Sequence, residues 1–299
     1  MADGSAAGPP RLRVGIVGTG RVGAVLGAAL RRAGHPVVAA SAVSDVSRLR
    51  AEALLPGVPI RELPEVVRDA DLVLVAVPDD ALPGLVEGLA QTGNLCPGQF
   101  WLHPAGRYGT EVLDPVTQAG ALPLAVHPVM SFTGTSVDLA RLADCPFGVT
   151  APTPLRPVAE ALVVEMGGEP VWVPQEQRVL YHAALAYGSN YLITLVAQCV
   201  ELLDCAGIEH ARRLVGPLLG ASLDNALRLG DQALTGPVAR GDAASVAAHL
   251  AAIAEVSQDA ADGYRALARV TAIRAVAAGL LPAAKAESLL EVLADGPRP

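Results

Sequence analysis

A glycine-rich loop near the start of the chain constrains the fold more than any other segment. The loop, Gly18-Thr19-Gly20-Arg21-Val22-Gly23, directly follows an apolar run at 13–17 and precedes a helix-length segment that begins near Arg21. In such a strand–loop–helix unit, the first glycine permits a tight turn, the second lets the backbone approach a pyrophosphate, and the third allows close helix–strand packing. The context disfavours an ordinary glycine-rich turn. We therefore predict a Rossmann-type dinucleotide-binding domain that contacts its cofactor through these six residues.

Short apolar runs alternate with helix-length segments through the first half of the chain. Their continuous apolar character predicts strands covered on both faces, as in a mostly parallel, doubly wound α/β sheet. After Pro174, Ala and Leu recur at helical spacing, which predicts an all-helical second half. We expect a flexible tail at 1–10, the α/β Rossmann domain at 11–174 and an all-α domain at 175–299. The strand-like runs lie at 12–17, 37–41, 72–77, 100–103, 122–127, 147–150 and 171–173.

Composition narrows the classes of partner and location. The formal net charge of -8 argues against nucleic acid, whose phosphates are bound by clustered Lys and Arg. The longest apolar stretch, roughly 183–203, is interrupted by Gln198 and Glu201, which favours a buried helix of a soluble protein over a membrane span. The chain shows no signal-peptide pattern, and its cysteines show neither paired nor zinc-ligand spacing. We expect a cytoplasmic protein with reduced thiols, no metal site and no membrane or nucleic-acid partner.

The segment after the second predicted strand bears on the choice of nucleotide. NAD-specific domains place a carboxylate there, about twenty residues after the loop, to bind the ribose 2′-hydroxyl. Here the strand ends in Ala40-Ser41-Ala42-Val43-Ser44, and Asp45 lies beyond its end. Ser41, Ser44 and Arg48 could bind a 2′-phosphate instead, which favours NADP(H) over NAD(H). Arg48 could equally be a solvated helix residue.

Polar residues follow the other strands at the predicted carboxyl edge of the sheet, where doubly wound sheets bind ligands. The third strand ends in Val77-Pro78-Asp79, which we expect beside the cofactor, although Asp79 could equally cap the next helix. His103 and His127 end two further strands. A histidine at a strand end is often only a structural hydrogen-bond partner, but two at one edge favour a contact with the nicotinamide or a substrate carbonyl. Ser131 and Thr133 could orient a substrate carboxylate.

The helical half offers a second group of polar candidates. His182, Ser189 and Asn190 share one face of the helix expected at about 177–203, where they could meet a substrate or be satisfied by neighbouring helices. Arg240 follows in a turn-forming segment, where it could hold an anionic substrate or pair with a surface carboxylate. Asp242 is expected to cap the next helix.

Three separated motifs together resemble a known family. The Rossmann-like proteins with a DUF2520 domain share the Tyr181-His182-Ala183-Ala184 … Ser189-Asn190-Tyr191 tract, the Leu234-Thr235-Gly236-Pro237 … Arg240-Gly241-Asp242 loop and the His127-Pro128 tract, over roughly 12–266. That family is related to 6-phosphogluconate-dehydrogenase-like reductases, including the ketopantoate, β-hydroxyacid and pyrroline-5-carboxylate reductases. The resemblance implies NADP-linked reduction of a small molecule, and gene-neighbourhood analogy suggests a ketopantoate-like 2-oxo acid. It also implies a homodimer formed through the helical domain.

One departure from those relatives shapes the expected mechanism. The β-hydroxyacid dehydrogenases and ketopantoate reductases place a catalytic lysine on the first helix of the second domain, and this chain has no lysine there. We expect reduction of a C=O or C=N group by NADPH, with His182 donating the proton. Two alternatives remain: an NADP(H)-binding sensor or scaffold without catalysis, and a prephenate-dehydrogenase-like enzyme. The remaining expected roles are Ser189 and Asn190 holding the reacting group, His127 and Thr133 bordering the nicotinamide, and Thr235 and Arg240 binding the substrate.

Overall fold

The computed structural model describes residues 11–294, so the tail expected at 1–10 lies outside the described residues. The chain divides into two compact units, Met1–Gly188 and Ser189–Pro299. The predicted boundary near residue 174 falls just after the last strand, whereas the units divide later, within one long helix.

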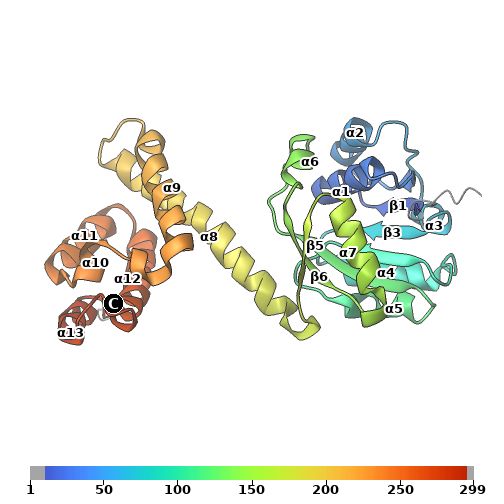
Figure 1. The fold of residues 1–299 in the computed structure, drawn as a ribbon. Helices are drawn as coiled ribbons and strands as arrows, with labels where there is room; N and C mark the ends of the chain where they lie inside the picture. The colour runs from blue at the N-terminus through green and yellow to red at the C-terminus, as the bar shows by residue number, and fades with distance from the viewer. Residues whose placement is uncertain (1–10, 295–299) are drawn as a thin grey trace, which may run out of the picture. The chain divides into compact units, whose positions relative to one another are not determined.

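The first unit is built on one seven-stranded sheet with the order β2-β1-β3-β4-β5-β6-β7 (Figure 1). Neighbouring strands are parallel except β5 and β6, which are antiparallel, so the predicted mostly parallel α/β sheet is confirmed. The direction of chain progression reverses between β1 and β3, the point at which doubly wound sheets bind ligands. The strands are β1 Val14–Val17, β2 Val37–Ala40, β3 Leu72–Val75, β4 Phe100–His103, β5 Leu122–Pro128, β6 Pro146–Thr150 and β7 Glu169–Trp172.

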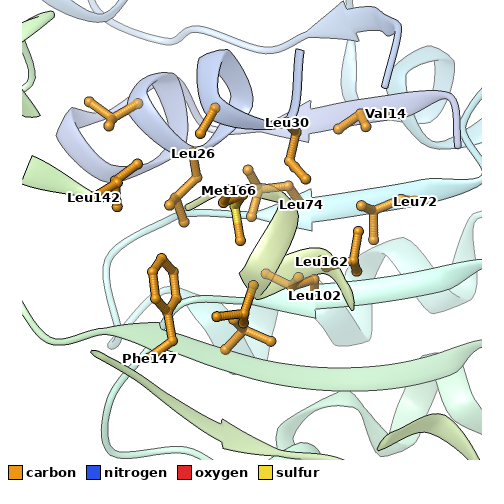
Figure 2. Packing of buried hydrophobic residues seen from close by; sticks show 14 of the residues in the cluster. Val14, Leu26, Leu30, Leu72, Leu74, Leu102, Leu142, Phe147, Leu162 and Met166 are labelled. Atoms are coloured by element: carbon orange, nitrogen blue, oxygen red, sulfur yellow. The ribbon is translucent and has the colours of Figure 1, made fainter. Parts of the chain in front are cut away.

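Helices cover both faces of this sheet, which explains why its strands are apolar throughout. On one face, Leu26 of α1 and Leu162 of α7 pack in one cluster with Leu74 of β3 (Figure 2). On the other face, Val86 of α4 packs in a cluster with the buried Trp101 of β4. The helices of this unit are α1 Arg21–Arg32, α2 Asp45–Leu54, α3 Leu63–Arg68, α4 Leu82–Gln91, α5 Asp114–Thr117, α6 Val137–Arg141 and α7 Arg156–Glu165, with 3-10 turns η1 Thr110–Leu113, η2 Thr153–Leu155 and η3 Gln175–Gln177.

The second unit is helical, as predicted. Its core gathers Val246 of α11, Ala272 of α12 and Leu289 of α13. Asp242 caps α11 as expected, because its Oδ1 accepts a hydrogen bond from the backbone N–H of Ser245 at 3.0 Å. The helices are α9 Ala211–Leu229, α10 Gly236–Arg240, α11 Ala243–Val256, α12 Gln258–Ala277 and α13 Ala283–Val292, with the 3-10 turn η4 Gly230–Ala233.

The long helix α8, Arg178–Cys205, runs from the first unit into the second. The predicted helix is confirmed, but its predicted burial is wrong for this chain: Ile193 is 67% exposed and Leu195 42% exposed. The physical reason is that α9 covers α8 around Val200, while the side chains before that part remain open. Among the described helices, α8 is long and apolar enough to cross a membrane by length and composition, which is weak evidence.

Candidate functional site

The glycine loop joins β1 to α1 at the switch point of the sheet. Gly18 has φ +95°, in the left-handed region that glycine adopts without strain. A Cβ on Gly23 would overlap the carbonyl oxygen of Gly18, whereas a Cβ on Gly20 would find one neighbour, the carbonyl oxygen of Ala76, at 4.0 Å. The loop therefore combines a tight turn, close helix packing and an open backbone face. This geometry fits the approach of a pyrophosphate to the N-terminus of α1.

The first side chain after Gly18 ties the loop to the next strand. Thr19 is buried, and its Oγ1 lies 3.1 Å from the carbonyl oxygens of both Ser41 and Ser47. The Oγ of Ser41 in turn accepts a hydrogen bond from the N–H of Gly18 at 3.0 Å. Ser41 thus lies against the glycine loop, and its expected contact with the cofactor remains a prediction.

The segment expected to bind the 2′-phosphate forms the first turns of α2. Ser44 caps this helix, with its Oγ accepting from the backbone N–H three residues on, at 3.2 Å. Arg48 is exposed. Arg50, which the sequence analysis missed, reaches the loop after β5: a Cβ on Gly134 would lie 2.6 Å from Nε of Arg50 and 2.9 Å from Cγ of Arg21. The structure therefore places a second α2 arginine beside the start of α1.

The end of β3 adjoins the glycine loop. A Cβ on Gly18 would lie 2.7 Å from the carbonyl oxygen of Ala76 and 3.2 Å from Cγ1 of Val77. Val77 thus adjoins the glycine loop, and the cofactor contacts expected of Val77 and Pro78 remain predictions. The alternative that Asp79 caps the next helix is wrong. Helix α4 begins at Leu82 without a side-chain cap, because an intervening turn separates Asp79 from the helix.

His103, at the end of β4, makes hydrogen bonds to the loop that follows this strand. Its Nδ1 accepts the N–H of Ala105 at 3.2 Å, so its Nε2 carries the proton donated to the carbonyl oxygen of Gly109 at 2.8 Å. The side chain is fully buried, and burial lowers its pKa from 6.5 to about 4, with the charge of Arg178 adding to this effect. Both ring nitrogens are used within the loop, which favours the structural alternative. Its contact with a cofactor remains a prediction.

The second histidine, His127, meets two side chains from the first turns of α8. Its Nδ1 lies 2.8 Å from the hydroxyl of Tyr181, and the ring centroids of His127 and His182 are 6.0 Å apart at an interplanar angle of 86°. Both histidines lie over Gly106, where a Cβ would be 2.6 Å from Cδ2 of His182 and 3.0 Å from Nε2 of His127. Because β1, β3, β4 and β5 are parallel, this group lies at the same edge of the sheet as the glycine loop.

A buried arginine supports this group. Arg178 is 1% exposed; its Nε donates to Oγ1 of Thr150 at 2.8 Å, and its Nη2 donates to the carbonyl oxygens of Ala125 at 3.0 Å and Gly148 at 3.1 Å. Its Nη1 has no hydrogen-bond partner among the described residues, and its Cζ lies 5.7 Å from the centre of the Tyr181 ring. Burial lowers its pKa to about 10, so it stays charged at neutral pH.

Several members of this group were not found from the sequence. Gly106 and Gly148 make room for it, since a Cβ on Gly148 would overlap the Tyr181 hydroxyl. The sequence signals were present but indirect: Gly106 follows His103 in the His-Pro-Ala-Gly tract, and Tyr181 belongs to the tract shared with DUF2520 proteins.

The loop after β5 is organised by a buried carboxylate. Asp138 is fully buried, and its Oδ2 accepts the N–H groups of Thr133 at 2.8 Å and Gly134 at 2.7 Å. The hydroxyl of Thr133 donates to Oδ1 of the same carboxylate at 3.0 Å. Ser131 is exposed at the start of the loop. The Thr133 hydroxyl is therefore engaged within the loop, and the substrate contacts expected of Ser131 and Thr133 remain predictions.

The other expected substrate residues belong to the second unit. Ser189 and Asn190 are exposed on α8. Thr235 precedes α10 as its N-cap residue, and Arg240 is the exposed last residue of that helix. Their roles remain predictions. Within residues 11–294, no group of three or more His, Cys, Asp or Glu side chains could hold a metal ion.

Two protein-family models match this chain, one over its α/β part and one mainly over its helical part. Residues 2–128 match the Rossmann-like domain, and residues 145–271 match the domain of unknown function DUF2520. The chain carries a Rossmann-like domain followed by a DUF2520 domain. The resemblance expected from the three motifs is thereby confirmed. No match was found among the curated proteins compared with this Rossmann–DUF2520 chain.

Solved structures share the fold over most of the chain. A Bacteroides fragilis protein provisionally assigned as an NADP oxidoreductase is 22% identical, with a TM-score of 0.72 over 88% of this chain and 98% of its own. The protein TM1727 from Thermotoga maritima is 22% identical, with a TM-score of 0.65 over 89% and 99%. A Streptomyces aurantiacus imine reductase is 18% identical, with a TM-score of 0.64 over 95% and 100%. At these identities the likeness establishes the shared fold.

Proposed function

We propose that this Rossmann–DUF2520 protein is an NADP(H)-dependent oxidoreductase that reduces the C=O or C=N group of a small acid. One observation carries the proposal: His127 and His182 lie edge to face over Gly106, at the same sheet edge as the open backbone of the glycine loop. Proton-donating side chains beside a dinucleotide loop are what such a reduction needs. The shared fold with an imine reductase is consistent with C=N chemistry.

The cofactor proposal rests on the fit of the first unit. Gly20 leaves its backbone open, and α1 has no acidic residue in its first turn to repel a pyrophosphate. Arg48 and Arg50 on α2, with Ser44 at its start, supply cations and donors for a 2′-phosphate. We expect NADP(H) to bind more tightly than NAD(H).

In the proposed reaction, His182 donates the proton to the oxygen or nitrogen of the reacting group. Bound NADPH would supply the hydride. His127 borders the nicotinamide side of the site, and Ser189 and Asn190 hold the reacting group from α8. Thr235 and Arg240 bind a substrate carboxylate, with Ser131 and Thr133 as further polar contacts. Among small acids, a ketopantoate-like 2-oxo acid is the first to test.

The direct experiment is a screen of small 2-oxo acids and cyclic imines with the purified full chain, followed by NADPH absorbance. Consumption with one class, abolished in His182→Ala while NADPH affinity is retained, supports the proposal. The matched control is His249→Ala, which removes a histidine that contacts Tyr264 in the second unit. Tight NADPH binding without turnover of any compound would favour the sensor alternative, and near-normal turnover by His182→Ala would contradict the assignment of the donor.

A homodimer through the helical domain, in the cytoplasm, completes the proposal. The helices of the second unit carry several exposed apolar side chains, including Ile193, Leu218 and Ile273. Several large apolar side chains exposed on one helical unit support an interface with a second copy of the chain. Light scattering of purified protein tests it: Ile193→Asp should yield monomer, whereas Val43→Asp, at a 97% exposed position of the first unit, should not. A monomeric wild-type chain contradicts the proposal.

A further inference from the structure

The contact between Tyr181 and His127 has a consequence for the chemistry of this site. We propose that Tyr181 is a positioning residue: its hydroxyl donates to Nδ1 of His127, which fixes His127 as a neutral imidazole with its proton on Nε2, ready to hydrogen-bond the reacting oxygen or nitrogen. What this N–H acts upon rests on the proposed function. The tautomer itself is a property of the chain and can be tested without cofactor or substrate.

The geometry sets the two groups in direct hydrogen-bond contact. The Tyr181 hydroxyl lies 2.8 Å from Nδ1 of His127, and the two rings meet at 89° with their centroids 5.6 Å apart. Gly148, opposite His127 in the antiparallel β5–β6 pair, has no side chain to displace the hydroxyl. The absence of a side chain at Gly148 thus leaves room for the Tyr181 hydroxyl beside His127.

The surroundings of Tyr181 determine which group donates. Among the described residues, the hydrogen-bond partner of the Tyr181 hydroxyl is Nδ1 of His127. A phenol O–H is a stronger proton donor than a neutral imidazole N–H, and Nδ1 of His127 is the acceptor within its reach, so the hydroxyl donates to Nδ1. Nδ1 then accepts, so the single proton of the neutral ring resides on Nε2.

Burial, together with nearby charges, lowers the pKa of His127 and keeps it neutral at neutral pH. Burial lowers the pKa of His127 from 6.5 to about 4, and His182, Arg178 and His103 add to the effect. Burial also raises the pKa of Tyr181, which keeps the phenol protonated. Glu111 is the carboxylate that acts on Arg178 from η1. The pair therefore holds two protons in total, one on the phenol oxygen and one on the imidazole.

The Nε2 side of His127 lies over Gly106. Gly106 leaves space beside Nε2, and the neighbouring ring there is that of His182. A neutral imidazole N–H fixed in advance stabilises charge that develops on a substrate oxygen without reorganising during the reaction. His127 would then hold the group to which His182 gives its proton.

The first test is the tautomer of His127 in the full chain labelled with ¹⁵N-histidine. Long-range ¹H–¹⁵N spectra of the wild type should show an unprotonated Nδ1 and a protonated Nε2, with signals assigned by their loss in His127→Gln. Tyr181→Phe should shift this pattern toward a mixture of tautomers. Tyr187→Phe, which removes a hydroxyl from the same helix, should not. An Nδ1–H tautomer in the wild type, or an unchanged pattern in Tyr181→Phe, would overturn the proposal.

The second test separates action through His127 from a merely structural role. With any compound that the chain turns over, Tyr181→Phe should lower kcat at least tenfold while the Kd for NADPH stays within twofold. In a His127→Asn background, whose amide presents an N–H without the phenol, adding Tyr181→Phe should change kcat by less than twofold. An equal loss in both backgrounds overturns the proposal. If no compound is turned over, the proposed function has failed, and the tautomer measurement still decides this inference.

Discussion

Gly23 lies so close to Gly18 that a Cβ on Gly23 would overlap the Gly18 carbonyl oxygen. Gly23→Ala should therefore destabilise the chain by about 1–3 kcal/mol, the usual cost of overpacking, measured by urea unfolding. Gly20→Ala is the matched substitution, because its Cβ would have 4.0 Å of space. It should leave stability unchanged and raise the Kd for NADPH at least tenfold, measured by calorimetry. Unchanged affinity in Gly20→Ala would mean that no pyrophosphate approaches this backbone.

Arg48 and Arg50 together should determine the preference for NADPH. Hydrogen bonds between a guanidinium and a phosphate contribute about 1.5–3 kcal/mol, which is a factor of about ten or more in affinity. The double variant Arg48→Ala/Arg50→Ala should lose that factor for NADPH and change NADH affinity by less than twofold. Arg68→Ala is the control, since Arg68 donates to Asn94 on the surface. Equal losses for both nucleotides would argue against 2′-phosphate binding by this pair.

Replacing Arg178 should destabilise the first unit strongly. Arg178→Met leaves Thr150 and the carbonyl groups of Ala125 and Gly148 without their buried donor, at a cost of about 3 kcal/mol or more. Urea unfolding of the full chain measures the change. Arg228→Ala, which breaks an exposed pair with Asp224, should change stability within experimental error. A small effect of Arg178→Met would show that the site relaxes without its guanidinium.

Stability should fall on mild acidification because of two histidines. His103 and His127 have pKa values of about 4 in the folded chain against an ordinary value of 6.5. Between these values the unfolded chain binds more protons, so the free energy of unfolding decreases as pH falls, by up to about 1.4 kcal/mol per pH unit for each histidine. Urea unfolding from pH 6.5 to 5 measures this slope. His103→Ala should reduce the slope whatever its effect at pH 7, and an unchanged slope would contradict the low pKa of His103.

The features that were predicted correctly from the sequence are those that depend on residues close together in the chain. The glycine loop, the apolar strands and the Asp242 cap each arise from a few consecutive residues, and their geometry follows from local sterics and hydrogen bonding. The helix at α8 followed from its apolar periodicity for the same reason. The exposure of α8 could not be predicted, because composition shows that a helix is apolar but does not show which other elements pack against it.

The histidine group illustrates what the sequence could not supply. That His103 and His127 end neighbouring strands was predictable, but their different partners were not. His103 turns back onto its own loop, whereas His127 meets a tyrosine from a helix beyond two further strands. The space left by Gly148 exists only once β5 and β6 pair antiparallel. Such a position depends on strand register, which periodicity does not encode.

The hydroxyl of Thr19 joins the carbonyl groups of Ser41 and Ser47, and so couples the glycine loop to the start of α2. Because the hydroxyl of Ser41 also accepts the N–H of Gly18, an attempt to re-engineer nucleotide preference at Ser41 would disturb the loop that is proposed to receive the pyrophosphate. Design for an altered nicotinamide cofactor should leave Thr19 and Ser41 intact and vary the arginines of α2.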